Sequence, residues 1–234
     1  MRKPFLFFDL DNTLLDFTWA EKRALSRAFR EVGLEPTPEI LERYRVINIR
    51  QWELLENGIL TREQVLLSRY EILFREFSIQ ASAKAVGDRY EELLQDGYRF
   101  IPGAQELLDL LRDRARLYII SNGSAKVQAA RIASSGIGPC FEGIFISENL
   151  GVDKPSPAYF HRCLTSIPDF DPSFALVIGD SLTSDIRGGI NAGLRTCWLN
   201  PEGKPHGPDI TPDFEIRQLS ELPVLLEQLF KGVD

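Results

Sequence analysis

Two acidic residues one position apart follow directly on an apolar run near the start of the chain. The run Phe5–Phe8 leads into Asp9 and Asp11, and Thr13 follows. Like charges this close repel each other, so the pair is favourable where a cation or a shared proton lies between them. A strand that runs into a capped helix uses similar residue types. Agreement with the later polar sites favours metal-assisted chemistry.

A second apolar run ends in the same way. Gly179 permits a tight turn after this run, Asp180 comes next, and Asp185 follows five residues later. Lys154 supplies the cation that these carboxylates lack, although a lysine in a loop is usually a solvated charge. An ordinary Gly-Asp turn is the alternative for this segment. The order of these residues and their placement after predicted strands favour one shared site.

A sheet is the element that must position these residues. After the first apolar run, strands are expected over residues 115–120, 143–146, 174–178 and 195–199, with helical stretches between them. This alternation implies right-handed crossovers and the α/β class, with a Rossmann-like parallel sheet flanked by helices. In open sheets of this kind the site lies beyond the carboxyl ends of the strands, where Asp9, Ser121 and Asp180 fall.

The segment between the first strand and the rest of the sheet has a helical pattern throughout. We therefore predict two domains. An α/β core domain takes residues 1–15 and 99–234, and an inserted all-helical domain takes residues 16–98.

Within the insert, Thr37 and Thr61 stand where helices are expected to begin, the first before a proline and the second with capping-box spacing. Five aromatic residues at helical spacing could stack on a base or a sugar, but they are expected mostly in the core of the insert: Phe17, Trp19, Tyr44, Trp52 and Tyr90. Three arginines could meet a second anionic group, but they are expected in solvent, because charged residues are rarely buried: Arg45, Arg50 and Arg69.

The composition excludes several classes of protein. The chain has 234 residues, 44% hydrophobic and 26% charged, and its net charge of −7 favours neither nucleic acid nor an anionic membrane surface. Three widely spaced cysteines argue against disulfides and zinc and favour a reducing compartment. The N-terminal apolar run stops too early for a signal peptide, and no segment approaches membrane-spanning length. We expect a cytoplasmic monomer or homodimer without nucleic-acid or membrane partners.

Taken together, the motifs resemble those of the haloacid dehalogenase-like (HAD) hydrolase superfamily. The pattern hhhDxDxT matches Phe7–Thr13, the strand-end Ser or Thr matches Ser121, the lysine matches Lys154, and GDxxxxD matches Gly179–Asp185. The helical insert lies where this superfamily places its C1 type of cap domain. The Ser-Asn-Gly sequence is similar to the branch of nucleotidase-type phosphatases, which act on nucleotides and other small phosphomonoesters.

This resemblance implies a phosphatase that acts on a small phosphorylated metabolite, with 5'-nucleotidase activity as the finer expectation. Asp9 would attack phosphorus to give an aspartyl-phosphate. Asp11 would protonate the leaving alcohol and later deprotonate the attacking water. Lys154 would offset the charge of Asp9 and of the phosphoryl group. Thr13 would fix the loop that follows the nucleophile.

The resemblance also assigns metal and phosphate ligands. The cofactor Mg²⁺ would be held by the carboxylates of Asp9 and Asp180 and by the backbone carbonyl of Asp11. Asp185 would orient metal-bound waters or Lys154. Besides the lysine, the phosphate oxygens would bind a loop at a helix start, made of Ser121, Asn122 and Gly123.

Three alternatives stay open at this point. A phosphomutase uses nearly the same residues as a phosphatase and differs in how long the phosphoenzyme survives. A 2-haloacid dehalogenase shares the fold, the nucleophile and the lysine, but it needs neither a leaving-group acid nor a metal, so Asp11 argues against it. A non-catalytic regulatory or binding protein would have lost at least one essential position, and none is missing.

Overall fold

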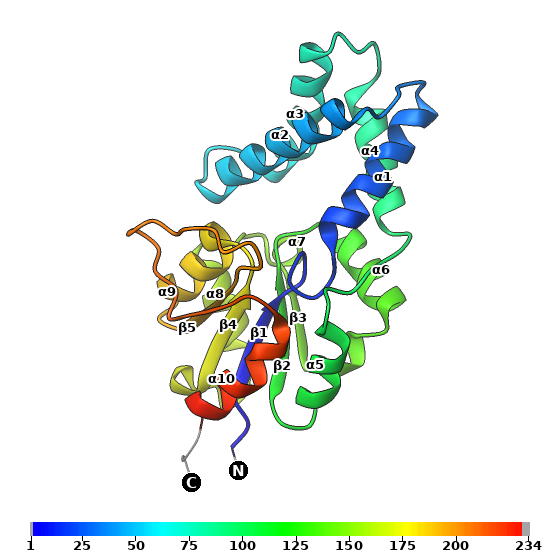
Figure 1. Ribbon diagram of the computed structural model, residues 1–234. Helices are drawn as coiled ribbons and strands as arrows, with labels where there is room; N and C mark the ends of the chain where they lie inside the picture. The colour runs from blue at the N-terminus through cyan, green and yellow to red at the C-terminus, as the bar shows by residue number, and fades with distance from the viewer. Residues whose placement is uncertain (1, 231–234) are drawn as a thin grey trace. The chain divides into compact units, whose positions relative to one another are not determined.

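The computed structural model describes residues 2–230 of the chain, and they divide into two compact units. One unit contains the segment up to Phe17 together with the chain from Tyr98 onward, and the other contains Thr18–Gly97. The first unit holds the sheet and the second is helical (Figure 1). Within the described residues, no helix combines the length and the apolar character needed to cross a membrane.

A six-stranded sheet forms the centre of the first unit, in the order β3-β2-β1-β4-β5-β6. Each strand pairs with its neighbours in parallel, so the predicted fold class is confirmed. Along the chain the strands are β1 Phe5–Asp9, β2 Arg116–Ser121, β3 Gly143–Ile146, β4 Ala175–Gly179, β5 Arg195–Leu199 and β6 Phe214–Ile216.

Successive residues of β1 point to opposite faces of the sheet, so this strand serves two hydrophobic cores. Leu6 and Phe8 pack in one core, whereas Phe5 and Phe7 pack in the other. The first core is covered by α5 (Ala104–Leu111), α6 (Ala125–Ser135) and α10 (Leu222–Leu229), and the second by α8 (Pro157–Thr165). The unit also contains two short helices, α7 (Ser147–Leu150) and α9 (Arg187–Asn191).

The parallel register brings the carboxyl ends of three strands to one edge of the sheet. Strand β1 lies between β2 and β4, and its last residue, Asp9, is opposite Ile120. Ser121 is the last residue of β2, and Asp180 follows β4 directly. The three polar positions expected beyond the strands therefore lie on adjacent strands.

One strand was not predicted from the sequence. Strand β6 has only three residues, and Glu215 in its middle is exposed. It pairs with β5 after a long loop rich in turn-forming residues. Three residues are too few to show the alternation of apolar and polar residues that identifies a strand. The segment becomes a strand because it pairs with the free edge of β5.

The helical unit, which we call the cap, is built from four helices: α1 Phe17–Glu31, α2 Pro38–Glu56, α3 Arg62–Glu76 and α4 Ala83–Leu94. The expected helix starts are present. The Oγ1 of Thr37 accepts a hydrogen bond from the amide of Ile40 at 3.3 Å. Thr61 and Gln64 cap each other, with a side chain to backbone bond in each direction at 3.3 and 2.8 Å.

The interior of the cap corrects one expectation. Arg69 is not in solvent, because only 2% of it is exposed. Its Nη1 donates to the Oδ1 of Asn48 at 3.0 Å, and its guanidinium lies 5.1 Å from the ring centre of Tyr70 and 5.2 Å from that of Tyr90. Tyr44 and Tyr90 are buried, as expected of core aromatics, whereas three others are only partly buried: Phe17, Trp19 and Trp52. Asn48 on α2, the ring of Tyr90 on α4 and the neighbouring Tyr70 make this burial possible, and the local sequence does not reveal the contacts with the two other helices.

Candidate active site

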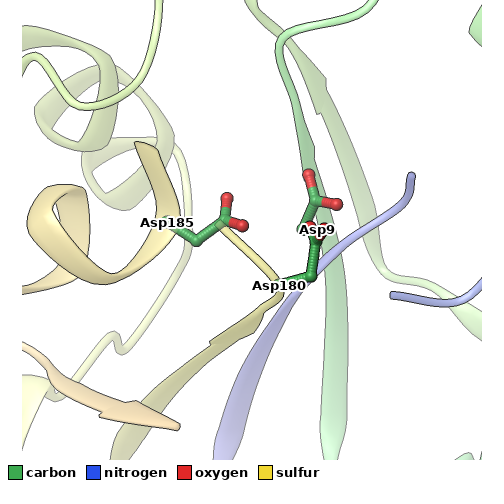
Figure 2. A group of neighbouring side chains, drawn as sticks. All are labelled: Asp9, Asp180 and Asp185. Atoms are coloured by element: carbon green, nitrogen blue, oxygen red, sulfur yellow. The ribbon is translucent and has the colours of Figure 1, made fainter. Parts of the chain in front are cut away.

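Three carboxylates meet at the carboxyl edge of the sheet. Asp9 ends β1, Asp180 follows β4, and Asp185 lies in a π-helical turn over Leu182–Ile186. One oxygen from each of the three lies within 4.8 Å of the others (Figure 2). Carboxylate oxygens this close are a suitable ligand set for a hard divalent cation such as Mg²⁺.

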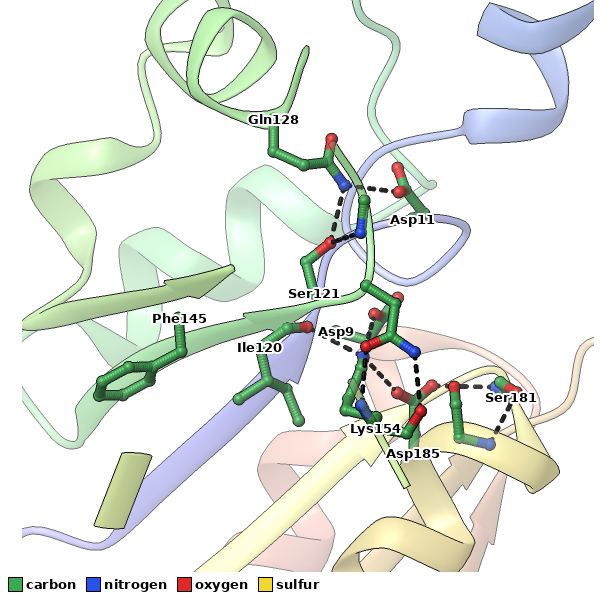
Figure 3. A network of polar contacts seen from close by, with 12 residues as sticks. Asp9, Asp11, Ile120, Ser121, Gln128, Phe145, Lys154, Ser181 and Asp185 are labelled. Carbon is green, nitrogen blue, oxygen red and sulfur yellow. Dashed lines mark hydrogen bonds and ion pairs between the residues drawn. The ribbon is translucent and has the colours of Figure 1, made fainter. Parts of the chain in front are cut away.

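Lys154 lies among these carboxylates and is only 1% exposed. Its Nζ donates to the Oδ1 of Asp9 at 2.7 Å and to the Oδ1 of Asp185 at 2.7 Å (Figure 3). A third bond reaches the carbonyl of Ile120 at 3.1 Å. All three ammonium protons are used, so the position of Lys154 is fixed by the site and not by solvent. Its contact with Asp185 is one of the two roles that the sequence suggests for that acid.

The side chain of Asn122 holds the segment that carries the lysine. Its Nδ2 donates to the carbonyl of Lys154 at 2.9 Å, and its Oδ1 accepts from the amide of Lys154 at 2.8 Å. The sequence assigns the backbone amide of Asn122 to phosphate, and it does not predict this role of the side chain. The two hydrogen bonds fix the loop after β2 against the segment that contains Lys154, although the two are far apart in the sequence.

Gly179 makes room for Asp185. A Cβ on this glycine would lie 2.2 Å from the Oδ2 of Asp185, far inside a normal contact distance. The same oxygen accepts a hydrogen bond from the amide of Ser181 at 3.1 Å. Asp185 is thus held by Ser181 on one oxygen and by Lys154 on the other, and only a glycine at position 179 allows that packing.

The electrostatics of the site show a shortage of positive charge. Burial raises the pKa of Asp9 to about 7, Lys154 opposes that rise, and Asp185 adds to it. Burial, and then the neighbouring carboxylates Asp9 and Asp185, hold the pKa of Asp180 well above its usual range. Burial alone would lower the pKa of Lys154, but Asp185 and Asp9 raise it. One lysine does not balance three carboxylates, so the residues fit a site that also takes a divalent cation.

The loop after β2 forms a second part of the site. The Oγ of Ser121 accepts a hydrogen bond from the amide of Gly123 at 3.1 Å and from the Nε2 of Gln128 at 2.8 Å. A Cβ at Gly123 would lie 2.3 Å from that Nε2, so the amide side chain packs directly on the glycine. The amide of Ser121 donates to the hydroxyl of Tyr159 at 3.2 Å.

The carboxylate of Asp11 lies apart from the group formed by the other three acids among the described residues. Its Oδ2 accepts from the Nε2 of Gln128 at 2.6 Å, and its Oδ1 is ion-paired with the Nη1 of Arg131. Both partners lie on α6, and sequence reasoning did not identify them. Their three-residue spacing places them on one face of a helix that starts just after the Ser121 loop, which is a detectable signal.

Thr13 is fully buried beneath this part of the chain. Within the described residues its Oγ1 has no hydrogen-bond partner. The structure therefore shows no side-chain hydrogen bond through which Thr13 would fix the loop after Asp9.

Comparison with known proteins agrees with this geometry. A sequence model of the haloacid dehalogenase-like hydrolase family matches residues 5–193, which include every strand-end residue described above. The chain is 41% identical to the HAD-hydrolase YfnB of Bacillus subtilis, over 93% of this chain and 92% of YfnB. A crystal structure of YfnB bound to magnesium has a TM-score of 0.92 and 40% identity, covering 97% of this chain and 99% of that one.

Two further relatives carry an assigned activity. The pyrimidine 5'-nucleotidase PynA of Streptococcus pneumoniae is 35% identical over 93% of this chain and 92% of its own length. The pyrimidine 5'-nucleotidase YjjG of Escherichia coli is 33% identical over 97% of this chain and 99% of its own length. These matches confirm the resemblance seen in the motifs: the chain belongs to the haloacid dehalogenase-like hydrolase family.

Proposed function

We propose that this protein is a Mg²⁺-dependent phosphatase that hydrolyses small phosphomonoesters through an aspartyl-phosphate on Asp9. One observation carries the proposal. The Nζ of Lys154 binds the Oδ1 of Asp9 at 2.7 Å, in a site where Asp180 and Asp185 complete a compact group of carboxylates. A buried carboxylate fixed by a cation, with oxygen ligands for a metal beside it, is what phosphoryl transfer to a side chain requires.

In this proposal Asp9 attacks phosphorus, and the phosphoryl oxygens lie beside the charge of Lys154 and against Ser121 and the amides of Asn122 and Gly123. Asp11, two residues from the nucleophile, gives a proton to the leaving oxygen and later takes one from water. Asp9, Asp180 and the carbonyl of Asp11 would hold Mg²⁺, which would supply positive charge to the phosphoryl oxygens. Asp185 keeps Lys154 in place through the 2.7 Å ion pair.

We further propose nucleoside monophosphates, with pyrimidine bases preferred, as the substrate class. The support comes from PynA and YjjG, both named pyrimidine 5'-nucleotidases, which match nearly the full length of this chain. The magnesium in the YfnB crystal structure supports the choice of metal. The presence of an acid at Asp11 favours phosphatase chemistry over dehalogenation, which has no alcohol to protonate.

The test is a measurement of phosphate release from nucleoside monophosphates, sugar phosphates and phosphoglycolate, with Mg²⁺ and with a chelator. We expect release that requires Mg²⁺ and is fastest with pyrimidine nucleotides. Asp9→Asn should abolish it, because the amide is a nearly isosteric replacement that cannot act as the nucleophile. Halide release from 2-chloropropionate is measured in parallel. Halide release without phosphate release would overturn the proposal in favour of the dehalogenase.

A further inference from the structure

We propose that Arg131 and Gln128 on α6 are positioning residues that hold Asp11 in the orientation needed for proton transfer to the leaving oxygen. The inference rests on the proposed phosphatase function, in which Asp11 is the acid. It deepens that function, because it names residues outside the four sequence motifs on which the protonation step depends.

Among the described residues, Arg131 has a single acidic partner. Its side chain is completely buried, and its Nη1 forms the ion pair with Asp11 and a hydrogen bond to the Oε1 of Gln128 at 2.9 Å. Its Nε and Nη2 have no hydrogen-bond partner in the part of the chain that the structure describes. Its guanidinium also lies 5.5 Å from the ring centre of Phe17. Burying a guanidinium is unfavourable without compensation, so Asp11 is the interaction that accounts for its presence.

Gln128 links the acid to the phosphate loop. Only 1% of Gln128 is exposed, and its Nε2 donates to the Oγ of Ser121 at 2.8 Å and to the Oδ2 of Asp11 at 2.6 Å (Figure 3). Its Oε1 is occupied by Arg131, so the amide cannot turn over without breaking that bond. One side chain thus sets the distance between a predicted phosphate ligand and the predicted acid.

Together the two residues hold both oxygens of one carboxylate. Gln128 binds Oδ2 and Arg131 binds Oδ1, so the plane of the Asp11 carboxylate is fixed by two separate donors. Each carboxylate oxygen has a second lone pair, and the side chain of Asp11 is 25% exposed, so the acid can still meet a leaving oxygen. Since reaction rates depend steeply on the placement of reacting groups, loss of either donor should slow the step that uses the proton.

The test compares two leaving groups. An alkyl phosphomonoester needs a proton on its leaving oxygen, whereas p-nitrophenol leaves readily as the phenolate. For Arg131→Met and Gln128→Met we compare kcat/KM, which covers the steps up to release of the leaving group and excludes the later hydrolysis of the aspartyl-phosphate. We expect kcat/KM to fall by about 10- to 100-fold on the alkyl ester that the wild type hydrolyses fastest. On p-nitrophenyl phosphate we expect kcat/KM to fall by less than about 3-fold, because its leaving group needs no proton. Asp11→Asn should show the same selectivity, and Arg131→Met in that background should add no further selective loss.

Controls separate a positioning role from a structural one. Arg131→Lys keeps a charge near Asp11 and should recover part of the alkyl-ester activity. Arg116→Met is the matched control. Arg116 is the first residue of β2, at the opposite end of that strand from Ser121, and its Nε pairs with Glu142 at 2.7 Å, so its loss should leave both rates unchanged.

Arg131→Met removes one partner of a buried pair and could prevent folding, so Gln128→Met serves as the independent variant. Equal losses of kcat/KM on the two esters, or no loss on either, would overturn the inference. A wild type that hydrolyses neither ester would instead overturn the proposed function.

Discussion

At the scale of single residues, Lys154 is the centre of the site. It is the group that two buried carboxylates share, with both N–O distances at 2.7 Å. Removing one partner of a buried ion pair destabilises a protein more than replacing the whole pair with apolar residues, because the remaining charges stay buried without a counter-charge. The lysine should therefore stabilise the folded protein in addition to its proposed role in the chemistry.

Lys154→Met should reduce the free energy of unfolding by about 3 to 5 kcal/mol in the presence of a chelator, because Asp9 and Asp185 lose their buried cation. Urea denaturation measures this change. The matched control is Lys204→Met, which removes a side chain that is 63% exposed and pairs with Glu202 on the surface. A change within about 0.5 kcal/mol is expected there. Equal effects of the two substitutions would contradict a stabilising role for the buried pairs.

Metal binding is tested at Asp180. With Mg²⁺ at about 100 times its Kd, linkage stabilises the folded state by about 2.7 kcal/mol, which raises the Tm of a protein of this size by roughly 5 to 10 °C. Asp180→Asn should lose most of this shift, because it removes one of the three clustered carboxylates. Asp169→Asn, an exposed acid with a positive φ that asparagine also tolerates, should keep it. A full Mg²⁺-dependent shift in Asp180→Asn would show that the metal binds elsewhere.

At the scale of elements, the turn after β4 sets the geometry of the site. Gly179 lies against Asp185, and Asp185 binds Lys154. The absence of a side chain at position 179 therefore permits the ion pair between Asp185 and Lys154. The π-helical turn over Leu182–Ile186 carries Asp185 back toward the strand. Widened helical turns of this kind often occur at functional sites.

Gly179→Ala should disturb this turn. The new Cβ would lie 2.2 Å from the Oδ2 of Asp185, so the carboxylate must move away from both Ser181 and Lys154. We expect kcat for phosphate release to fall by about 100-fold and stability to fall by about 1 to 3 kcal/mol. Gly207→Ala is the control, since nothing lies within 4 Å of its Cβ position. Wild-type activity in Gly179→Ala would mean that the turn can shift without cost to the site.

The order of strands and helices and the position of the site at the strand ends were predictable from the sequence. Alternating strands and helices are local patterns, and parallel strands must end at one edge, so the convergence of Asp9, Ser121 and Asp180 followed from periodicity and topology. The contacts of Gln128 and Arg131 with Asp11 did not, because their spacing shows only that they share one helix face. Polar residues on a helix usually face solvent, and only the fold shows what this face meets. The same reason explains the buried Arg69, whose partners come from other helices of the cap.

At the scale of the whole molecule, the two units differ in what their interiors contain. The interior of the sheet unit is apolar on both faces, and its buried charges lie at the carboxyl edge. The cap has polar groups inside. Its Glu21 is 7% exposed and accepts a hydrogen bond from the Nδ2 of Asn48 at 2.8 Å. Buried polar groups that make few hydrogen bonds usually lower stability. Because Glu21 can ionise, we expect the stability of the cap to depend on pH.

Burial raises the pKa of Glu21 from 4.5 to about 7, although Arg69 opposes the rise. Below pH 4.5 the acid is protonated in both the folded and unfolded chain and has no effect. Between pH 4.5 and 7 only the unfolded chain releases the proton, so stability falls as the pH rises. Glu21→Gln should therefore stabilise the protein by about 1 to 3 kcal/mol at pH 8 and hardly at all at pH 4.5.

Urea denaturation at the two pH values tests this prediction. Glu35→Gln is the control, because that side chain is 76% exposed and should give the same stability as the wild type at both. A stabilisation by Glu21→Gln that is equal at the two pH values would show that ionisation of Glu21 is not its cause.

The central position of β1 has a consequence for the synthesis of the chain. Phe5 pairs with Arg116 on one side and with Ala175 on the other, so both neighbours of β1 are translated more than a hundred residues later. At ordinary translation rates the apolar segment Phe5–Phe8 waits roughly 5 to 20 seconds for its first partner. During that time it is an unpaired strand of high β-propensity, which is the kind of segment that aggregates. Production of this protein should therefore benefit from low temperature or chaperones that bind the nascent N-terminus.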